Sequence, residues 1–425
     1  MKSKQYLASE HFWAKKLHAG WRYEFFNELI SDTIDNRGRT VPTSDYGIPL
    51  IATNCISNDL LYPKFKDIRH ISQKTHDEWF RNGHAEPNDI IFVNKGSPGQ
   101  VCLVPSPVNF SFAQDMIGLK IDNKKIDFRY LLAVLRTKFM QEQIDAFHVG
   151  TLIPHLKKAD FNSIIIPIPP KKLEVFIGEY YLTISRKIDN LKNQNQILEQ
   201  IAQTIFKSWF IDFDGQTEFE DSELGKIPKG WKVIDLKNSL SLLKDGSHNP
   251  PKRVESGIRF IAGATDVKHF TIDFSKCTFI TQKDYEEIHK TWQIQSHDIL
   301  LTIVGTIGNV AIVNQNDLPF SLQRSLAVLR PNEKIDFIFL YCLLNSNKFE
   351  QFLYSNLNPT GQPGIYLGTL GGFQFVLPPK PLIEKFFKLS QTIVSNIQKN
   401  YSNMDYLMKI RNSLLPKLMS GEIRV

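Results

Sequence analysis

The sequence predicts an α+β fold in which a mostly-β domain followed by a long helix occurs twice in tandem. Three observations predict it: motifs that return at one offset, β-branched and aromatic runs broken by turn residues in each copy, and a heptad pattern at the end of each copy. A chain of 425 residues is long enough for two domains, each with its own core.

The internal repeat is the strongest of these observations. Trp21 recurs as Trp231 after 210 residues, and Asp89 recurs as Asp298 after 209 residues. The segment "GIPLIA" likewise returns as "GIRFIA", and "NDIIFVNKGSPGQVCLV" returns as "HDILLTIVGTIGNVAIV". One offset kept over so much of the chain indicates a tandem duplication, which predicts pseudo-twofold symmetry.

The first part of each copy is rich in β-branched and aromatic residues, in short runs cut by Gly, Pro, Asn and Asp. This pattern is typical of short strands joined by turns. Each part ends in a proline-rich stretch, "IIIPIPPKK" in the first copy and "FVLPPKP" in the second. We therefore expect one β-rich domain over residues 1–172 and another over residues 213–381.

The second part of each copy is poor in Gly and Pro and has apolar residues at heptad spacing. It predicts long helices over residues 173–212 and 382–425 that pair as an antiparallel coiled coil. We pair residues whose numbers sum to 595, so that Asn195 lies opposite Asn400 in an otherwise apolar seam. Because a slipped register would leave these amides without partners, we expect the two asparagines to fix the register.

The same pairing rule predicts other contacts between the helices. Trp209 should meet Phe386, whereas Arg411 opposite Ile184 would be an unfavourable pair. The alternative is that each helix is amphipathic and packs only on its own domain, with the two asparagines facing solvent.

The composition predicts a cytoplasmic protein without a membrane segment. The formal net charge of +7 suits a polyanionic partner. Four cysteines without a C-x-x-C pair and 11 histidines without H-E-x-x-H spacing predict neither a disulfide framework nor a metal site. The longest nearly apolar run, residues 299–313, is too short to span a bilayer, and the N-terminal residues lack the apolar stretch of a signal peptide.

No catalytic residue is predicted. The segment Asn249-Pro250-Pro251-Lys252 resembles the signature of adenine amino-methyltransferases, but Lys252 stands where that signature has an aromatic residue to stack on the base. The chain contains no G-x-G sequence, so the glycine-rich turn that would seat a nucleotide-like cofactor is missing. We interpret the Asn-Pro-Pro segment as a loop.

Most candidate nucleic-acid contacts lie on three matched pairs of loops; Gln114 and Gln323, which match at the offset of 209, and Arg324 lie outside them. Two G-x-x-G segments, "KGSPGQ" and "VGTIGN", read as hairpin turns that need positive φ, or as places where backbone approaches a phosphate. Two further loops, "DNRGRTVP" and "DGSHNPPK", precede the Gly-Ile turns, and two more, "VGTLIPHL" and "PTGQPGIYL", precede the final strands. The candidate DNA-binding residues are Arg37, Arg39, Thr40, Lys95, Ser97, Gln100, Gln114, Thr151, His155, Lys244, Ser247, His248, Asn249, Thr306, Asn309, Gln323, Arg324 and Gln362.

Taken singly, each of these loops is typical of a solvated turn. For Gln323, the alternative to a DNA contact is that it begins a strand and faces solvent. Six such loops in register, in a basic chain, favour contact with nucleic acid.

At this point the sequence resembles the specificity (S) subunits of type I restriction-modification enzymes. The resemblance rests on "IPKGWKV", on "DGSHNPPK" before "SGIRFIAG", on "VLPPKPLIEKF", on "LEQIAQTIFKSWFIDFDG" and on "RNSLLPKLMSGEIRV", and it covers essentially the whole chain. One departure from the pattern is "LHAGWRYEF" at the start of the first domain, a looser version of "IPKGWKVID".

The resemblance implies that each β-rich domain is a target-recognition domain that reads one half of a split site in double-stranded DNA. It further implies that the helices hold the domains apart and bind two methyltransferase (M) subunits, with restriction (R) subunits completing the complex. The chain itself would be no enzyme and would hold no cofactor, because S-adenosylmethionine would bind to the partner methyltransferase.

Two other function classes stay open on the sequence. One is a free-standing bipartite nucleic-acid-binding regulator, which would bind tightly without partners. The other is an enzyme whose site is built across the two copies. A neighbouring reading frame with a G-x-G cofactor loop and an Asn-Pro-Pro-aromatic signature would favour the specificity subunit.

Overall fold

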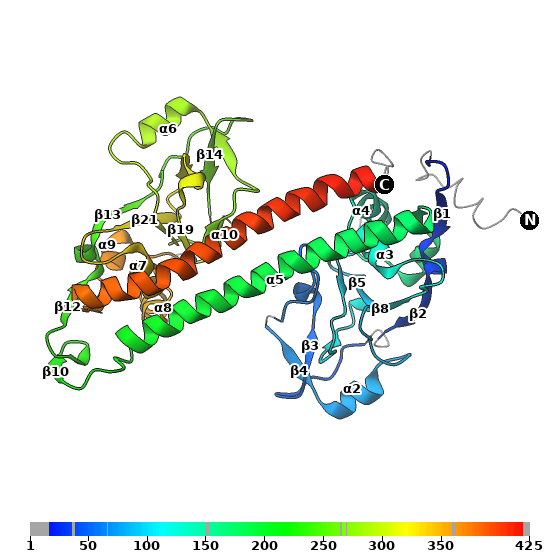
Figure 1. The fold of residues 1–425 in the computed structure, drawn as a ribbon, viewed down its shortest axis with the longest axis horizontal. Coiled ribbons are helices and arrows are strands. Elements are labelled where there is room, and N and C mark those ends of the chain that lie inside the picture. The colour runs from blue at the N-terminus through cyan, green and yellow to red at the C-terminus, as the bar shows by residue number, and fades with distance from the viewer. Residues whose placement is uncertain are drawn as a thin grey trace, which may run out of the picture. The chain divides into compact units, whose positions relative to one another are not determined.

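The computed structural model describes residues 17–35, 39–65, 67–148, 153–263, 266–268, 270–358 and 363–419. The chain divides into two compact units, the first formed by Met1–Leu191 with Met404–Val425 and the second by Lys192–Asn403. Each unit combines a β-rich part with segments of two long helices (Figure 1). Within the described residues, no helix is both long enough and apolar enough to cross a membrane.

The described part of the first unit contains three small sheets. The four-stranded antiparallel sheet has the order β2 (Ile30–Ile34), β8 (Met116–Ile121), β5 (Ile90–Val93) and β6 (Val101–Leu103). The three-stranded sheet has the order β4 (Arg69–Ile71), β3 (Ile48–Ile51) and β7 (Ser111–Phe112), with β3 and β7 parallel. The third sheet pairs β1 (Arg22–Phe25) with β9 (Ile165–Ile168).

The second unit repeats this topology. Its four-stranded sheet has the order β13 (Leu240–Asp245), β21 (Leu326–Pro331), β18 (Ile299–Thr302) and β19 (Val310–Ile312). Its three-stranded sheet has the order β17 (Thr278–Ile280), β14 (Ile258–Ile261) and β20 (Phe320–Leu322), and β12 (Lys232–Asp235) pairs with β22 (Gln374–Leu377). Two hairpins are added, β10 (Phe219–Ser222) with β11 (Gly225–Pro228) and β15 (Val267–Lys268) with β16 (Thr271–Ile272). The shared strand order confirms the duplication.

Matching helices of the two units begin at matching polar caps. In the first unit α2 (Gln73–Trp79), α3 (Phe128–Leu135) and α4 (Lys138–Asp145) start at Ser72, Asp127 and Thr137. In the second unit α6 (Gln282–Ile288), α7 (Phe337–Leu344) and α8 (Asn347–Ser355) start at Thr281, Asp336 and Ser346, each 209 residues later. Each cap side chain accepts a hydrogen bond from a backbone N–H of the first turn, which satisfies a donor that the helix leaves open.

The two long helices are α5 (Lys171–Phe210) and α10 (Lys380–Met419), each of 40 residues. Within the second unit, the ring centroids of Trp209 and Phe386 lie 6.3 Å apart, and Asn195 and Asn400 are hydrogen-bonded. Residue numbers therefore fall along one helix as they rise along the other, so the two segments are antiparallel. The predicted contacts between these residues are present, and the alternative in which the asparagines face solvent is wrong for Asn195, which is buried.

Within the first unit, Arg411 of α10 is also buried. Its guanidinium donates to Ser185 Oγ at 3.4 Å and lies 5.6 Å from the ring centroid of Tyr181, both on α5. The pairing rule placed Arg411 opposite Ile184. The adjacent Ser185 supplies a polar partner for it, so the expected unfavourable contact is avoided.

An aromatic cluster holds the end of α5 inside the second unit. The ring centroids of Phe206 and Phe210 each lie 5.1 Å from that of Phe339 on α7. Phe386 of α10 completes the cluster, 5.8 Å from Phe206 and 5.3 Å from Phe210. Burying aromatic side chains of this size contributes about 1.5–3 kcal/mol each, so this end of α5 is firmly fixed to the unit.

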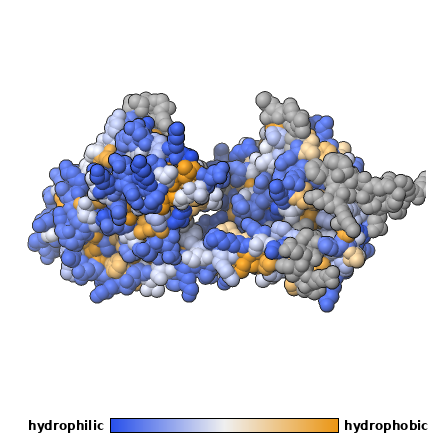
Figure 2. All heavy atoms as spheres, turned by 90° about the horizontal axis from the view of Figure 1, so that it is seen from above, coloured by the Kyte–Doolittle hydropathy of each residue, from blue (hydrophilic) through white to orange (hydrophobic). Residues whose placement is uncertain are grey.

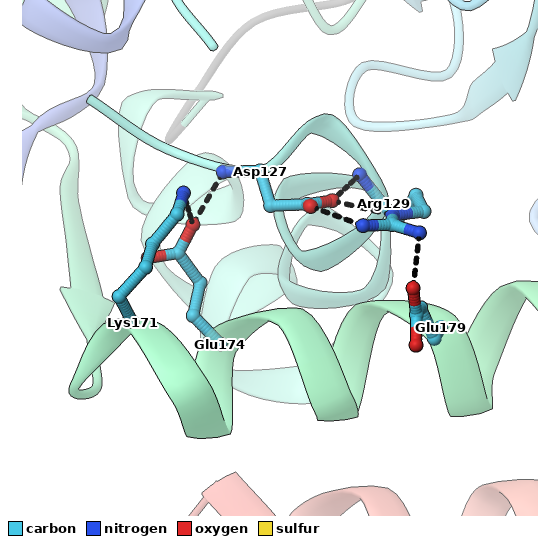
Figure 3. Close-up of polar contacts among 5 residues, drawn as sticks. All are labelled: Asp127, Arg129, Lys171, Glu174 and Glu179. Carbon is cyan, nitrogen blue, oxygen red and sulfur yellow. Dashed lines mark hydrogen bonds and ion pairs between the residues drawn. The ribbon is translucent and has the colours of Figure 1, made fainter. Parts of the chain in front are cut away.

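A polar network joins α3 to the start of α5 in the first unit (Figure 3). Glu174 is only 1% exposed and accepts hydrogen bonds from the Asp127 backbone N–H and from Lys171. Arg129 donates to both carboxylate oxygens of Asp127 and, at 2.9 Å, to Glu179 of α5. Burial on its own would raise the pKa of Asp127, but the hydrogen bonds and charge of Arg129 outweigh it and lower that pKa.

In the second unit, the corresponding contact between α7 and the start of α10 is made by apolar side chains. Ile338 and Ile383, both buried, stand 209 residues after Arg129 and Glu174. Asp336 keeps the helix cap, but within the described residues its Oδ2 atom has no hydrogen-bond partner, and burial raises its pKa. The two units are thus alike in topology and different in the chemistry of this joint.

Candidate nucleic-acid interface

Both G-x-x-G segments form the turns of hairpins, β5–β6 in the first unit and β18–β19 in the second. Gly96 and Gly99 have φ of 88° and 89°, and Gly305 and Gly308 have φ of 81° and 94°. Residues with a Cβ rarely adopt this left-handed backbone, so these positions require glycine. The hairpin interpretation of the two segments is confirmed.

Each hairpin tip is tied by the same backbone hydrogen bonds to the loop before the final strand. Gly96 N donates to Pro154 O at 2.9 Å, and Gly305 N donates to Pro363 O at 3.0 Å. Leu156 N donates to Asn94 O at 2.8 Å, and 209 residues later Ile365 N donates to Ile303 O at 3.0 Å. Two of the three predicted loops in each unit therefore lie side by side.

The hairpin tip of the first unit presents exposed polar side chains. Lys95 and Ser97 are exposed on the hairpin, and the exposed His155 lies across from Lys95 in a short antiparallel bridge. The ring of His155 is 3.4 Å from Asn94 Nδ2. Gln114 is half-buried in the neighbouring turn, which accepts a hydrogen bond from the Asn94 backbone through Asp115 O.

Gln100 has a different environment from its exposed neighbours. Its Oε1 accepts a hydrogen bond from Asn58 N at 2.7 Å, and Asn58 Oδ1 accepts one from Val101 N at 2.9 Å. Gln100 therefore holds the hairpin to the loop around residue 58. Asn309 in the second unit is similar, because its side chain donates to Val267 O at 3.2 Å.

In the second unit the loop before the Gly-Ile turn joins the turn after β20. Ser247 N donates to Leu322 O at 2.9 Å, and Arg324 N donates to Ser247 O at 3.1 Å. Arg324 is exposed, and the half-buried Gln323 bridges Ser247. Gln323 follows β20, so the expectation that it begins a strand is wrong.

The hairpin of the second unit reaches the same turn. Ile303 N donates to Ser325 O at 2.8 Å, next to Arg324, while the exposed Thr306 lies at the hairpin tip. His248 is exposed, and its Nε2 is 2.8 Å from Asp245 Oδ2. The structure thus gathers candidates from the hairpin, the loop and the turn into one neighbourhood of this unit.

The remaining candidates are less closely placed. Arg39, Thr40, Lys244 and Asn249 are exposed, and the segment around Asn249 is a loop, as expected. Arg37, Thr151 and Gln362 lie outside the described residues. On the face drawn in Figure 2, hydrophilic residues cover most of the described surface and hydrophobic residues form separate patches.

Two exposed aromatic residues were missed by the sequence reasoning. Tyr366 is 67% exposed and follows Ile365, whose N–H donates to Ile303 O directly after β18 of the second unit. Tyr46 is 84% exposed in the turn before β3 of the first unit. An aromatic residue on a predicted loop is a usable signal, because exposed rings can stack on bases.

Comparison with known proteins gives one consistent result. A family model described as the type I restriction modification DNA specificity domain matches residues 33–205 and 228–416. The type I restriction enzyme MjaIX specificity subunit of Methanocaldococcus jannaschii is 31% identical over 349 residues, which cover 79% of this chain and 78% of that protein. The EcoBI specificity subunit of Escherichia coli is 24% identical over 364 residues, covering 79% and 74%.

The fold is also similar to a solved structure. The type I restriction-modification S subunit from M. genitalium aligns with a TM-score of 0.54 at 17% sequence identity, covering 95% of this chain and 98% of that chain. At this identity the likeness concerns the fold alone.

Proposed function

Because the chain belongs to the type I restriction modification DNA specificity domain family, we propose that it selects the DNA sequence on which a type I restriction-modification complex acts. One observation carries the proposal. Both units hold the same hairpin frame with the same backbone hydrogen bonds, yet the exposed side chains on that frame differ. Two units with the same backbone frame and different exposed side chains suit a bipartite DNA site, in which each unit recognises one half.

The exposed side chains suggest how each half-site is read. Arg324 can bind guanine O6 and N7 with two hydrogen bonds, and Gln323 or Gln114 can bind adenine N6 and N7 in the same way. Lys95 suits a phosphate, which positions the protein without carrying sequence information. Part of the affinity should therefore fall with rising salt, because phosphate contacts release counterions.

The chain would act as a binding and assembly subunit in the cytoplasm and would not itself be an enzyme. Two methyltransferase subunits, which bind S-adenosylmethionine, would carry out the methylation, and restriction subunits would complete the complex. We expect the long helices to set the spacer between half-sites. A helix of 40 residues is about 60 Å long, compared with about 34 Å for one turn of duplex.

Domain exchange tests this proposal. Residues 35–168 are replaced by the matching segment of a relative, and the methylated motif is read by sequencing the methylome of cells that carry the whole system. One half of the motif should change and the other half should stay. If both halves change, or if deleting the gene leaves the methylome unaltered, the proposal is wrong.

A further inference from the structure

We propose that His76, Asp77 and His84 of the first unit bind a divalent transition-metal ion, most naturally zinc. Each of these residues offers one potential ligand atom, and the three atoms lie within 4.8 Å of one another. The sequence predicted no metal site because the spacing matches no common motif. The fold nevertheless brings together two imidazoles and a carboxylate, which is a ligand set that zinc prefers.

The backbone around His84 is fixed in place. His76 and Asp77 lie on α2, and His84 lies in the loop that follows it. Asn82, in the same loop, has a positive φ of 60°, and its side chain donates to Asp32 Oδ1 and to Thr33 O, both at 3.0 Å. The loop is therefore anchored to β2, and its geometry holds the ring of His84 against that of His76, with centroids 3.9 Å apart.

The ring of His76 is already oriented on its other side. Its Nδ1 lies 2.6 Å from Ser111 Oγ, and Ser111 is only 4% exposed. With the proton on Nδ1, His76 donates to this hydroxyl and keeps the lone pair of Nε2 for a metal. A hydrogen bond to the second ring nitrogen is the usual support of a metal-binding histidine.

In the second unit, Ser321 matches Ser111, and the histidine beside it, His289, has a purely structural role. His289 Nε2 lies 3.0 Å from Ser321 Oγ, and His289 Nδ1 lies 3.3 Å from Trp292 O, so both of its nitrogens have protein partners. The positions 209 residues after the three proposed ligands hold Tyr285, Glu286 and Gln293. Among the described residues, the ligand set therefore belongs to the first unit alone.

Metal binding requires the ligand atoms to move closer together and the two rings, now stacked at an interplanar angle of 13°, to turn towards one ion. Tetrahedral zinc with bonds of about 2.0 Å places its ligand atoms about 3.3 Å apart. Asp77 is exposed and His84 is half-exposed, so both side chains can turn towards the ion. A water would complete the coordination. The bound ion would tie α2 to the loop at His84 and, through Ser111, to β7, and so would stabilise the first unit.

Zinc binding is tested on the full-length chain after treatment with a chelator. Equilibrium dialysis against zinc, with metal counted by plasma mass spectrometry, should give one ion per chain. His84→Gln should lose this ion and Asp77→Asn should bind it more weakly. The matched control His248→Gln removes an exposed histidine from the second unit and should bind like the unchanged chain.

Thermal unfolding supplies an independent readout that does not depend on DNA recognition. Zinc should raise the Tm of the unchanged chain and of His248→Gln, but not that of His84→Gln. The metal-free forms should melt alike, which shows that the variant folds. Should the unchanged chain bind no zinc, or should both His84→Gln and Asp77→Asn bind as much as the control, the proposal is overturned.

Discussion

The side-chain amide of Asn400 donates a hydrogen bond to Asn195 Oδ1 at 2.8 Å, from α10 to α5 within the second unit. Asn195 is 4% exposed, and its own amide donates to Ile397 O at 3.3 Å. A buried amide that lacks partners costs about 1–3 kcal/mol, so a helix pair shifted in register would lose this arrangement. We infer that the two asparagines select the register.

Replacing Asn400 by Ala should therefore lower the free energy of unfolding by about 1–2 kcal/mol, because Asn195 Oδ1 loses its donor. Urea unfolding measures this loss. Asn403→Ala, at an exposed position of the same helix, is the control and should change the free energy of unfolding by less than about 0.5 kcal/mol.

Cysteines placed at positions 195 and 400 should cross-link readily; cross-linking at a shifted pair instead would refute the register.

The turn after β20 should contact bases. Arg324→Ala and Gln323→Ala should each weaken binding of one half-site by about 1–3 kcal/mol and relax its sequence preference. The measurement is DNA binding by the assembled complex to sites altered in one half. Lys290→Ala removes an exposed charge from the turn that follows α6 in the same unit and should leave the preference unchanged. Equal losses on both half-sites would contradict base contact by this turn.

Acid should destabilise the second unit through His289. Burial holds the pKa of this histidine below its ordinary value of 6.5. The unfolded chain then takes up a proton at a higher pH than the folded chain does, so stability is fully present above pH 6.5 and is lost as the pH falls towards the folded pKa. Urea titrations between pH 7 and 5 should show this loss. His289→Gln should flatten this slope.

The Asp127–Arg129 pair should affect stability at a lower pH than His289 does. The lowered pKa of Asp127 means that its contribution is present above pH 3.8 and is lost as the pH falls below that value. Arg129→Met should reduce the free energy of unfolding at neutral pH by about 1–3 kcal/mol, because Asp127 loses two charged hydrogen bonds. The variant should also lose less stability on acidification below pH 4. An unchanged acid limb would show that Arg129 does not set this pKa.

The chain alone should not transfer methyl groups to DNA. Lys252 is exposed in a loop, at the place where the adenine signature needs an aromatic ring. Lys252→Phe should therefore create no activity when the purified chain is incubated with DNA and labelled S-adenosylmethionine. Incorporation of label by either form would show that the chain carries a catalytic site of its own.

The features that could be predicted from the sequence are those that follow from the heptad pattern or from the internal repeat. Trp209 and Phe386 meet because the heptad rows and the repeat together fix which residues face each other. The glycines of both hairpins were predictable for a similar reason, since Gly96 and Gly305 occupy a backbone conformation that few other residues adopt. In both cases the signal is local or repeated.

The features that escaped prediction depend on contacts between unrelated segments. Gln100 stood out as a polar residue on a hairpin, and nothing in its neighbours signals that its amide oxygen binds Asn58 N. His76 and His84 come together because Asn82 turns the chain through a positive φ. Arg411 donates to Ser185, the neighbour of the residue that the pairing rule placed opposite it. A long side chain can contact a residue one position away from its expected partner, and a rule based on residue numbers does not capture this.

The bonds that tie the hairpins to their neighbouring loops join main-chain atoms only. Gly96 N and Pro154 O, like Gly305 N and Pro363 O, stay in place whichever side chains stand beside them. Mutation can therefore replace Lys95, Ser97 or Thr306 at little cost to stability. A new set of exposed contact residues can therefore arise by exchange of side chains alone, while the hydrogen-bonded backbone that carries them is inherited unchanged.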